Sequence, residues 1–320
     1  MLTGALIETL PVPSRWDFGG HAYGLEPLTL PDTAAFPAQD TPGTGTNPGD
    51  DLESSRRSLR DLGGAADPGL APTIPDPVER LFWFRWITGH QTTFILWQLL
   101  AQARAHGADD TGDTDDADDT VAEERARVFV RGYSAMLLYT GSCPRDIYHR
   151  VIRPSMALQH PGFSGSWASD FRPVRVLLRG GGPPGRDTPL TRERELNVAI
   201  HEGIADKLVP GGQSLLKTVA RQESMTWKRS TLAVLYDMYF LTLRAAVPYQ
   251  VVVRQLMRRL HAIGRDIATN GLYPDYASSA QEKPPGLRTP SALECEATIP
   301  ETLFAIATQV AGGTQSWEGQ

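Results

Sequence analysis

The chain contains 320 residues, 41% of them hydrophobic, and carries a formal net charge of −6. This composition supports a substantial core in one large or two small domains, and the acidic balance excludes a phosphate-neutralising surface and hence a nucleic-acid binder. Two cysteines are too few for a disulfide framework. Without a signal peptide or about 18 consecutive apolar residues, the sequence predicts a cytoplasmic protein with no membrane span.

The N-terminal part of the chain changes composition twice. Residues 1–30 hold aromatic side chains around Gly19 and Gly20, and we expect them to form an arm packed on the main body. Residues 31–73 are rich in Pro, Gly, Asp, Ser and Thr, which bury too little apolar surface to offset the entropy of ordering. They are predicted to be a flexible or disordered linker, followed by one helical domain over residues 74–320.

Residues 76–106 are predicted to form a central, buried helix. Asp76 suits the N-cap, Pro77 the first helical position, and Glu79 the closing position of a capping box. Apolar side chains occur on every face, which is typical of a helix buried all round. His90 lies at its centre. Because burying an imidazole without a partner is costly, His90 has either a hydrogen-bonding neighbour or a functional role.

The next segments are an acidic loop and two helices. Residues 107–120 are predicted to be a solvated loop, since their spacing lacks the Gly and Glu of a calcium-binding EF-hand. An amphipathic helix is predicted over residues 121–141. A short helix then begins at Pro144, and we expect Pro154 to end it.

Three arginines, Arg145, Arg150 and Arg153, lie close together beside Tyr148 and ahead of the Gly- and Ser-containing loop 160–167. A guanidinium group binds a carboxylate with two parallel hydrogen bonds. The stretch therefore indicates either a carboxylate-binding site or ordinary surface arginines.

A further helix is predicted over Thr191–Leu208, after a flexible connection at residues 179–187 whose glycines lack the ending of a phosphate loop. His201 lies beside the apolar stripe of this helix. Gly203 follows two residues later, where a large flat group could approach closely, although chance explains a glycine there equally well. The helix is predicted to end at the loop 209–214.

The last third of the chain indicates long helices. One is predicted over residues 227–246, and Pro248 separates it from a basic amphipathic helix that runs through Ile263. Residues 270–300 are rich in Pro and predicted to be irregular, and a short helix follows over 301–311. Since strand patterns are few, the predicted fold class is mainly α, a helical bundle.

Three segments in order resemble the tryptophan 2,3-dioxygenase family, over roughly residues 76–220. The first, ERLFWFRWITGHQTTFILWQLL, resembles that family's distal helix with its His-Gln pair. The second, DIYHRVIRPSMALQHPGFSGSWASDFR, is similar to its Arg-containing helix and Gly-Phe loop, and the third, HEGIADKLVPGGQS, to its axial histidine and glycine-rich loop. With the WDFGG arm and the chain length, the chain looks like a heme-dependent L-tyrosine hydroxylase of antibiotic biosynthesis, in the histidine-ligated heme-dependent aromatic oxygenase superfamily.

This resemblance implies a bundle that holds a b-type heme. His201 would be the axial ligand of the iron, and His90 would be the distal acid or base, with a pKa near neutrality. Trp86 and Phe94 lie one turn on either side of His90 and would wall the heme site, or would be plain core packing. Relatives acting on 3-methyltyrosine tether heme through a cysteine four residues after the axial histidine. Ala205 stands there, so the heme would be non-covalent.

The resemblance also implies a substrate site and a reaction. Arg150, or alternatively Arg153, would hold the substrate carboxylate, and Ser164 and Ser214 would face the substrate. The reaction would convert L-tyrosine to 3,4-dihydroxyphenylalanine, with hydrogen peroxide or dioxygen as the oxidant. A homodimer is compatible with the sequence.

Other functions fit the same residues. One is a tryptophan- or indole-oxidising enzyme of the same fold, although the loop at Pro210–Ser214 keeps only part of the dioxygenase pattern. A second is a non-catalytic heme carrier or sensor. A third is a helical interaction module whose aromatic helix meets a protein partner.

Overall fold

The structure, a computed structural model, describes residues 25–32, 78–106, 116–178, 188–219, 227–274 and 283–312. The fold is mainly helical, as predicted, with one pair of short strands among the described residues. The elements are β1 (Leu28–Leu30), α3 (Glu79–His106), α4 (Asp116–Gly141), α5 (Arg145–Ile147), η1 (Tyr148–Ile152), α6 (Arg153–Gln159), η2 (Gly165–Trp167), α7 (Phe171–Leu178), α8 (Pro189–Leu208), η3 (Pro210–Gly212), α9 (Leu215–Val219), α10 (Arg229–Tyr239), β2 (Thr242–Arg244), α11 (Tyr249–Asn270), η5 (Pro285–Leu287), α12 (Pro290–Ala297) and α13 (Ile299–Gly312).

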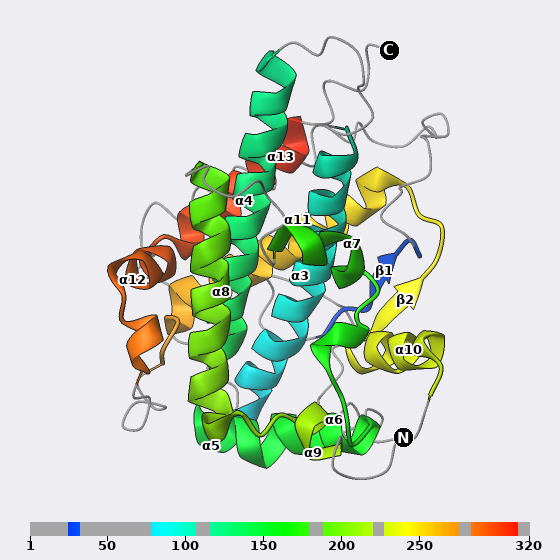
Figure 1. Ribbon diagram of the computed structural model, residues 1–320, viewed down its shortest axis with the longest axis vertical. Helices are drawn as coiled ribbons and strands as arrows, with labels where there is room; N and C mark the ends of the chain where they lie inside the picture. The colour runs from blue at the N-terminus through cyan, green and yellow to red at the C-terminus, as the bar shows by residue number, and fades with distance from the viewer. Residues whose placement is uncertain are drawn as a thin grey trace.

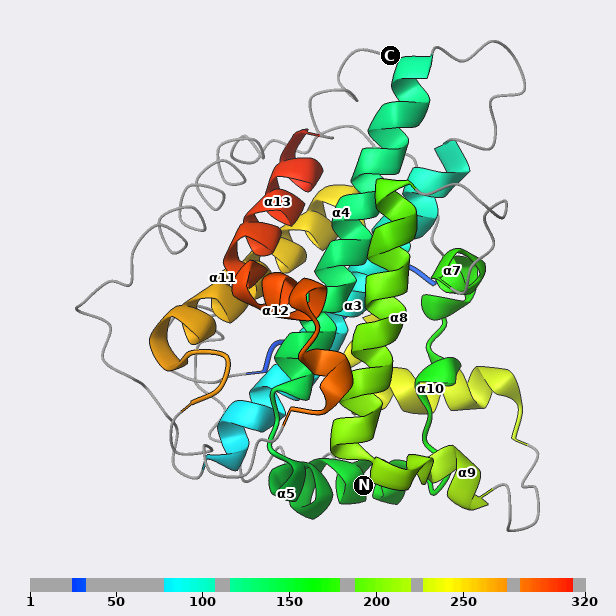
Figure 2. The same cartoon turned by 60° about the vertical axis from the view of Figure 1, so that its left-hand side comes forward.

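The core is built around α4, which packs against both α3 and α8 (Figure 1). Glycines lie where these helices approach closely. A Cβ on Gly89 of α3 would overlap Thr140 Cγ2 of α4, and one on Gly141 of α4 would overlap the side chain of Ile204 on α8. Helices α11 and α13 complete the bundle, with α11 against α3 and α13 against α4 (Figure 2).

Two helix boundaries differ from the prediction. The helix α4 begins at Asp116, inside the acidic run that was predicted to be a loop. The prediction that Pro154 ends its helix is wrong. The turn before it widens into the π-helical η1, in which the Arg153 N–H reaches Tyr148 O, and Pro154 then occupies the first turn of α6, where its missing N–H costs nothing.

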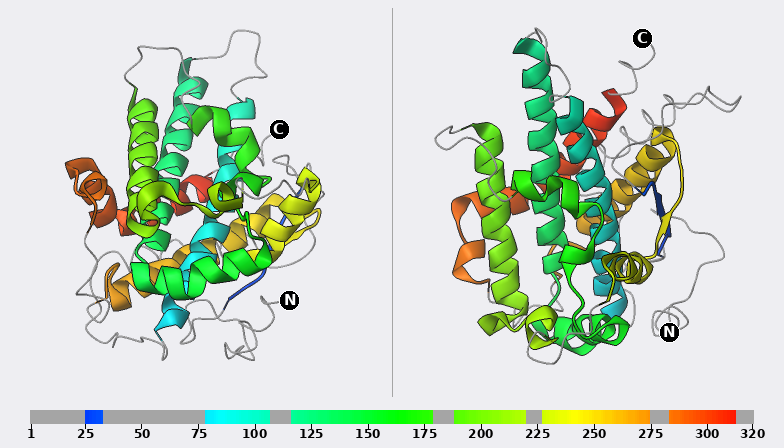
Figure 3. Two further views of the ribbon diagram at one scale, coloured as in Figure 1. Left: turned by 60° about the horizontal axis from the view of Figure 1, so that its bottom comes forward. Right: turned by 45° about the vertical axis from the view of Figure 1, so that its right-hand side comes forward.

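The predicted C-terminal end of the helix over residues 227–246 is also wrong. Helix α10 stops at Tyr239, Leu241 takes a positive φ of 51°, and the chain continues as β2. Strand β2 pairs in parallel with β1, and the right-hand view of Figure 3 shows the two side by side. Pairing with a strand more than 200 residues away in the sequence overrides the local helical pattern.

Residues 270–300 are not irregular throughout. Helix α11 extends to Asn270, where Gly271 with a φ of 69° ends it, and α12 occupies Pro290–Ala297 with Thr289 accepting a hydrogen bond at its N-cap. Pro290 starts this helix instead of disrupting it, because the first helical N–H needs no partner.

The described part of the N-terminal region, residues 25–32, packs on the helical body through β1. Leu28 and Leu30 are fully buried, and the backbone N–H and C=O of Thr29 both bond to the side-chain amide of Gln255 on α11. The rest of the predicted arm, the predicted linker beyond residue 32, the proposed N-cap Asp76 and the connection 179–187 lie outside the described residues. Among the described helices, none is both long and apolar enough for a bilayer crossing.

Candidate functional site

His90 lies in the middle of α3, and one of its ring nitrogens is committed to the helix itself. Its Nδ1 is 2.6 Å from the backbone carbonyl oxygen of Trp86, one turn earlier. A carbonyl oxygen can only accept, so Nδ1 donates, and the neutral imidazole carries its lone pair on Nε2. Among the described residues, none donates a hydrogen bond to Nε2, and His90 as a whole is partly buried. The arrangement presents Nε2 as an acceptor.

The charge state of His90 differs from the expectation of a near-neutral pKa. Desolvation by the surrounding core lowers the pKa of His90 to about 4, and the hydrogen bond to Trp86 opposes this only in part. The group is therefore neutral at pH 7. Such an imidazole accepts a hydrogen bond, while its protonated form is costly in this environment.

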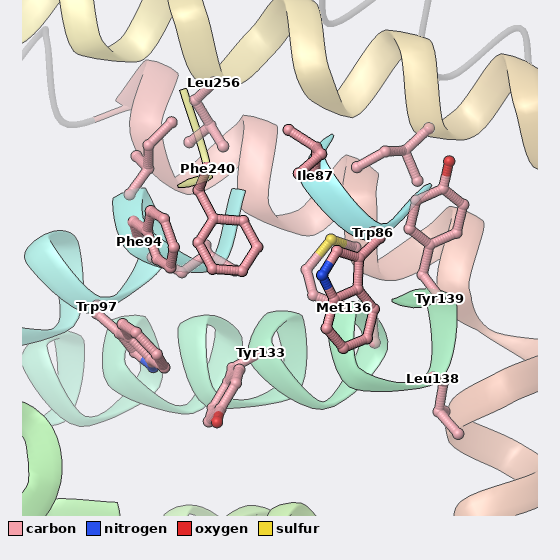
Figure 4. Close-up of a cluster of buried hydrophobic side chains, with 14 of the residues drawn as sticks. Trp86, Ile87, Phe94, Trp97, Tyr133, Met136, Leu138, Tyr139, Phe240 and Leu256 are labelled. Atoms are coloured by element: carbon pink, nitrogen blue, oxygen red, sulfur yellow. The ribbon is translucent and has the colours of Figure 1, made fainter. Parts of the chain in front are cut away.

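Aromatic rings surround His90. The ring of Phe240 stacks on it at 4.5 Å with an interplanar angle of 19°, Trp86 lies at 4.4 Å, and Phe94 meets it edge-on at 6.5 Å. Figure 4 shows Trp86, Phe94 and Phe240 in a buried cluster that also holds Trp97 and Tyr133, and Trp97 contacts both Phe94 and Tyr133. The structure thus brings together the three predicted residues of α3: Trp86, His90 and Phe94.

Two buried indole N–H groups in this group, those of Trp86 and Trp97, have no hydrogen-bond acceptor among the described residues. The ring of Tyr133 packs against that of Trp97 at 5.3 Å. Buried donors are nearly always satisfied in folded proteins, so each of these groups is a place where a water or a ligand could accept a hydrogen bond.

His201 lies on α8, on the opposite side of α4 from the helix that carries His90 (Figure 1). Its side chain is exposed, and so is Ala205 one turn later. The face of α8 that meets α4 is formed by other residues, including Asn197, which donates to Ser134 of α4. The imidazole of His201 is therefore directed away from the centre of the helix contact, and the structure does not bring His201 next to His90.

Gly203 has a different role from the one considered in the sequence. A Cβ at this position would lie 2.7 Å from Leu287 Cδ2 and 3.4 Å from the Leu287 backbone nitrogen. The absence of a side chain at Gly203 therefore allows η5 to pack closely against α8. No flat cofactor is needed to explain it.

The predicted substrate arginines lie in different environments. Arg150 is 57% exposed and donates to Glu79 at 2.6 Å, with Asp146 at 3.6 Å. Arg153 is less exposed and donates to the backbone carbonyl of Gln213 at 2.6 Å. Arg153 therefore joins α6 to the loop that follows α8, whereas Arg150 has the contacts of a surface ion pair.

The two predicted serines hold turns. Ser164 accepts from Ser166 N at 3.2 Å and caps η2, and Ser214 accepts from Lys217 N at 3.3 Å at the start of α9. The structure brings Ser214 next to the residue that Arg153 binds, Gln213. It shows no such link between Arg153 and Ser164.

Two aromatic neighbours of the site were missed in the sequence: Phe240 stacks on His90, and Tyr236 contacts Phe94 at 5.6 Å. Tyr148, which the sequence indicated only beside the arginines, contacts Trp86 at 5.8 Å. The aromatic spacing of residues 236–240 was visible as an apolar helix face, but nothing local indicates that this face meets α3. Within the described ranges, no group of three or more His, Cys, Asp or Glu side chains could together hold a metal ion.

One family model matches the chain. Residues 38–195, slightly less than half of the chain, are similar to the family of SfmD 3-methyl-L-tyrosine peroxygenase. The matched stretch includes α3 with His90 and the arginines of η1 and α6, and it ends before His201. No curated protein matches the chain.

Proposed function

We propose that this protein is a heme-dependent hydroxylase that converts L-tyrosine to 3,4-dihydroxyphenylalanine in the biosynthesis of a secondary metabolite. The observation that carries the proposal is His90, a neutral imidazole with an available acceptor nitrogen inside a cage of aromatic rings. The family match supports it, because that family is described as a peroxygenase acting on a tyrosine derivative. Heme, when bound, would supply the oxidising chemistry.

The structure does not bring the two histidines to one heme site. His201 lies on α8 and His90 on α3, and α4 packs between these two helices. The rings of α3 and α4 near His90 pack against one another. The proposal therefore takes His201 as the residue that would hold the iron from the sequence resemblance, and one protein ligand suffices to hold heme iron.

His90 would position the phenol and hold its proton. Because Nδ1 is bonded to the Trp86 carbonyl, only Nε2 can accept the phenol O–H of the substrate. The low pKa keeps His90 neutral at pH 7, so its Nε2 would accept a hydrogen bond from the neutral phenol. Trp86 and Phe94 exclude water from the same space.

The amino-acid end of the substrate would be bound by Arg153 in preference to Arg150. Arg153 already bridges α6 and the loop at Gln213, and its guanidinium keeps further donors for a carboxylate. Arg150 is engaged with Glu79 and Asp146 at the surface. Ser214, next to Gln213, would face the same carboxylate or ammonium group.

A spectrum and a product analysis test the proposal. The wild-type protein purified after heme-supplemented expression should show a Soret band, and His201→Ala should lose most of it. With tyrosine and hydrogen peroxide, the wild type should form a product heavier by one oxygen atom. The heme should be extractable into acidified organic solvent, since Ala205 cannot form a thioether. A colourless wild type, or His201→Ala with an unchanged Soret band, would refute the assignment.

The family match favours a second candidate substrate, 3-methyl-L-tyrosine. The phenol and amino-acid ends are the same, so His90 and Arg153 would bind both. Comparing kcat/KM for the two substrates decides between them, and a ratio above one for the methylated substrate would replace L-tyrosine in the proposal. Indole or tryptophan turnover in the same assay would instead support the tryptophan-oxidising alternative.

A further inference from the structure

Phe240 stacks on His90, and its backbone is hydrogen-bonded to Gln91, the residue next to His90. The ring of Phe240 lies nearly parallel to the imidazole at 4.5 Å, so it covers one face of His90. Rotation of the imidazole about its Cβ–Cγ bond would collide with that ring, and rotation would also break the hydrogen bond from Nδ1 to Trp86 O. Phe240 is itself almost completely buried.

The backbone at Phe240 is held by Gln91, the residue next to His90 on α3. The two amide hydrogens of Gln91 Nε2 go to Phe240 O at 2.9 Å and to Glu26 O at 3.0 Å. Its Oε1 accepts from Arg259 Nε at 3.0 Å. Every hydrogen-bonding position of this buried amide except one acceptor lone pair is used, and the assignment of its N and O atoms follows from these partners.

The partners of Gln91 come from three separate parts of the fold. Arg259 belongs to α11, is fully buried, and also donates to Glu26 O at 3.0 Å. Glu26 directly precedes β1, and Leu28 N of β1 donates to Leu241 O at 2.9 Å. Leu241 is the residue with positive φ, an unfavourable conformation for a side chain with a Cβ. These bonds hold the chain in the turn that directs Phe240 at His90.

We infer that Phe240 is a positioning residue for His90, held in place by the hydrogen-bonding hub of Gln91, Glu26 and Arg259. The inference rests on the proposed function in assigning His90 a role in turnover. The flat ring of Phe240 and the Trp86 carbonyl together fix both the plane and the tautomer of the imidazole, so that Nε2 points at the substrate phenol.

The test uses the full chain and reads His90 directly. In protein labelled with ¹⁵N-histidine, the His90 resonances are assigned by their loss in His90→Gln, and their shifts report which ring nitrogen carries the proton. The variants are Phe240→Leu, which removes the flat face, Phe240→Tyr, which keeps it, and Gln91→Glu, which retains an acceptor for Arg259 but removes both donors. Phe82→Leu is the matched control, because Phe82 is an equally buried phenylalanine on α3 whose ring contacts Arg85.

Wild type, Phe240→Tyr and Phe82→Leu should show a single tautomer protonated at Nδ1, whereas Phe240→Leu and Gln91→Glu should show a mixture. In turnover with tyrosine, the last two should lose kcat on the order of 10- to 100-fold with a smaller change in KM, as expected for a misdirected acid–base group. Circular dichroism checks that each variant is folded. If Gln91→Glu does not fold, the comparison of Phe240→Leu with Phe240→Tyr is the test.

Unchanged histidine shifts in folded Phe240→Leu would overturn the inference, and so would an equal loss of kcat in Phe240→Tyr. If the wild type turns over no tyrosine, the proposed function fails, but the tautomer measurement still decides whether Phe240 positions His90.

Discussion

At the scale of single residues, His90 links the stability of the fold to pH. Its pKa is about 4 in the folded protein, against the ordinary value of 6.5 for histidine. The folded pKa is lowered, so between these values the unfolded chain binds more protons than the folded one. The contribution of neutral His90 to stability is therefore complete above about pH 6.5 and is lost as the pH falls toward 4.

The shift predicts a measurable difference between wild type and His90→Leu. The lowering of the pKa from 6.5 to about 4 corresponds to at most about 3 kcal/mol, because His90 is only partly buried. Between pH 7 and pH 4.5, the free energy of unfolding of the wild type should fall more than that of His90→Leu. Urea denaturation at both pH values measures this, and parallel losses in the two proteins would show that His90 titrates normally.

The assignment of the substrate carboxylate to Arg153 and not to Arg150 leads to a different expected effect for each substitution. Arg153→Leu should raise the KM for tyrosine on the order of 10- to 100-fold, the effect of losing a hydrogen bond to a charged group. Arg150→Leu should change KM little, because an exposed ion pair contributes at most about 1 kcal/mol. Steady-state kinetics decide it, and a larger effect in Arg150→Leu would assign the carboxylate to Arg150.

At the scale of elements, the crossing of α3 and α4 depends on the absence of a side chain at Gly89. A methyl group there would overlap Thr140 Cγ2 and lie 3.2 Å from Tyr139 Cδ1. Glycine lowers the intrinsic stability of a helix interior by about 1 kcal/mol relative to alanine. The close packing of the two helices therefore outweighs the helix propensity at this position.

Gly89→Ala should accordingly destabilise the protein by about 1–3 kcal/mol, as overpacking in a core does. The second-site change Thr140→Ser removes the overlapping methyl group and keeps the hydroxyl that donates to Met136 O at 2.9 Å. The double variant should regain much of the loss. Chemical denaturation of the single and double variants checks this, and strictly additive effects would mean that the two residues do not meet.

At the scale of the whole molecule, residues 25–32 join parts of the chain that are far apart in sequence. Glu26 O accepts from both Gln91 and Arg259, Thr29 pairs with Gln255, and β1 pairs with β2. Removing this segment leaves buried donors on α3 and α11 without acceptors, each at a cost of about 1–3 kcal/mol. The segment thus belongs to the folded body and supports the surroundings of His90.

Two truncations separate this contribution from the rest of the N-terminal region. Deleting residues 1–32 should lower the free energy of unfolding by at least about 3 kcal/mol more than deleting residues 1–24, since only the longer deletion removes the acceptors and the buried Leu28 and Leu30. Equal stability of the two truncated proteins, measured by urea denaturation, would show that β1 is dispensable.

The sequence by itself determined the helical class, the buried α3, and the grouping of Trp86, His90 and Phe94. These follow from side-chain spacing within one helix, because residues three or four apart share a face whatever the rest of the chain does. The helices over residues 121–141 and 191–208 were predictable for the same reason.

Tertiary structure alone decided the rest. The end of α10 and the strand at Thr242–Arg244 depend on β1, and the stacking of Phe240 on His90 depends on that turn. The need for glycine at position 203 comes from the close packing of Leu287 against α8. The lowered pKa of His90 comes from burial by several helices at once. Each is a contact between segments distant in the chain, and local patterns carry no information about which segments meet.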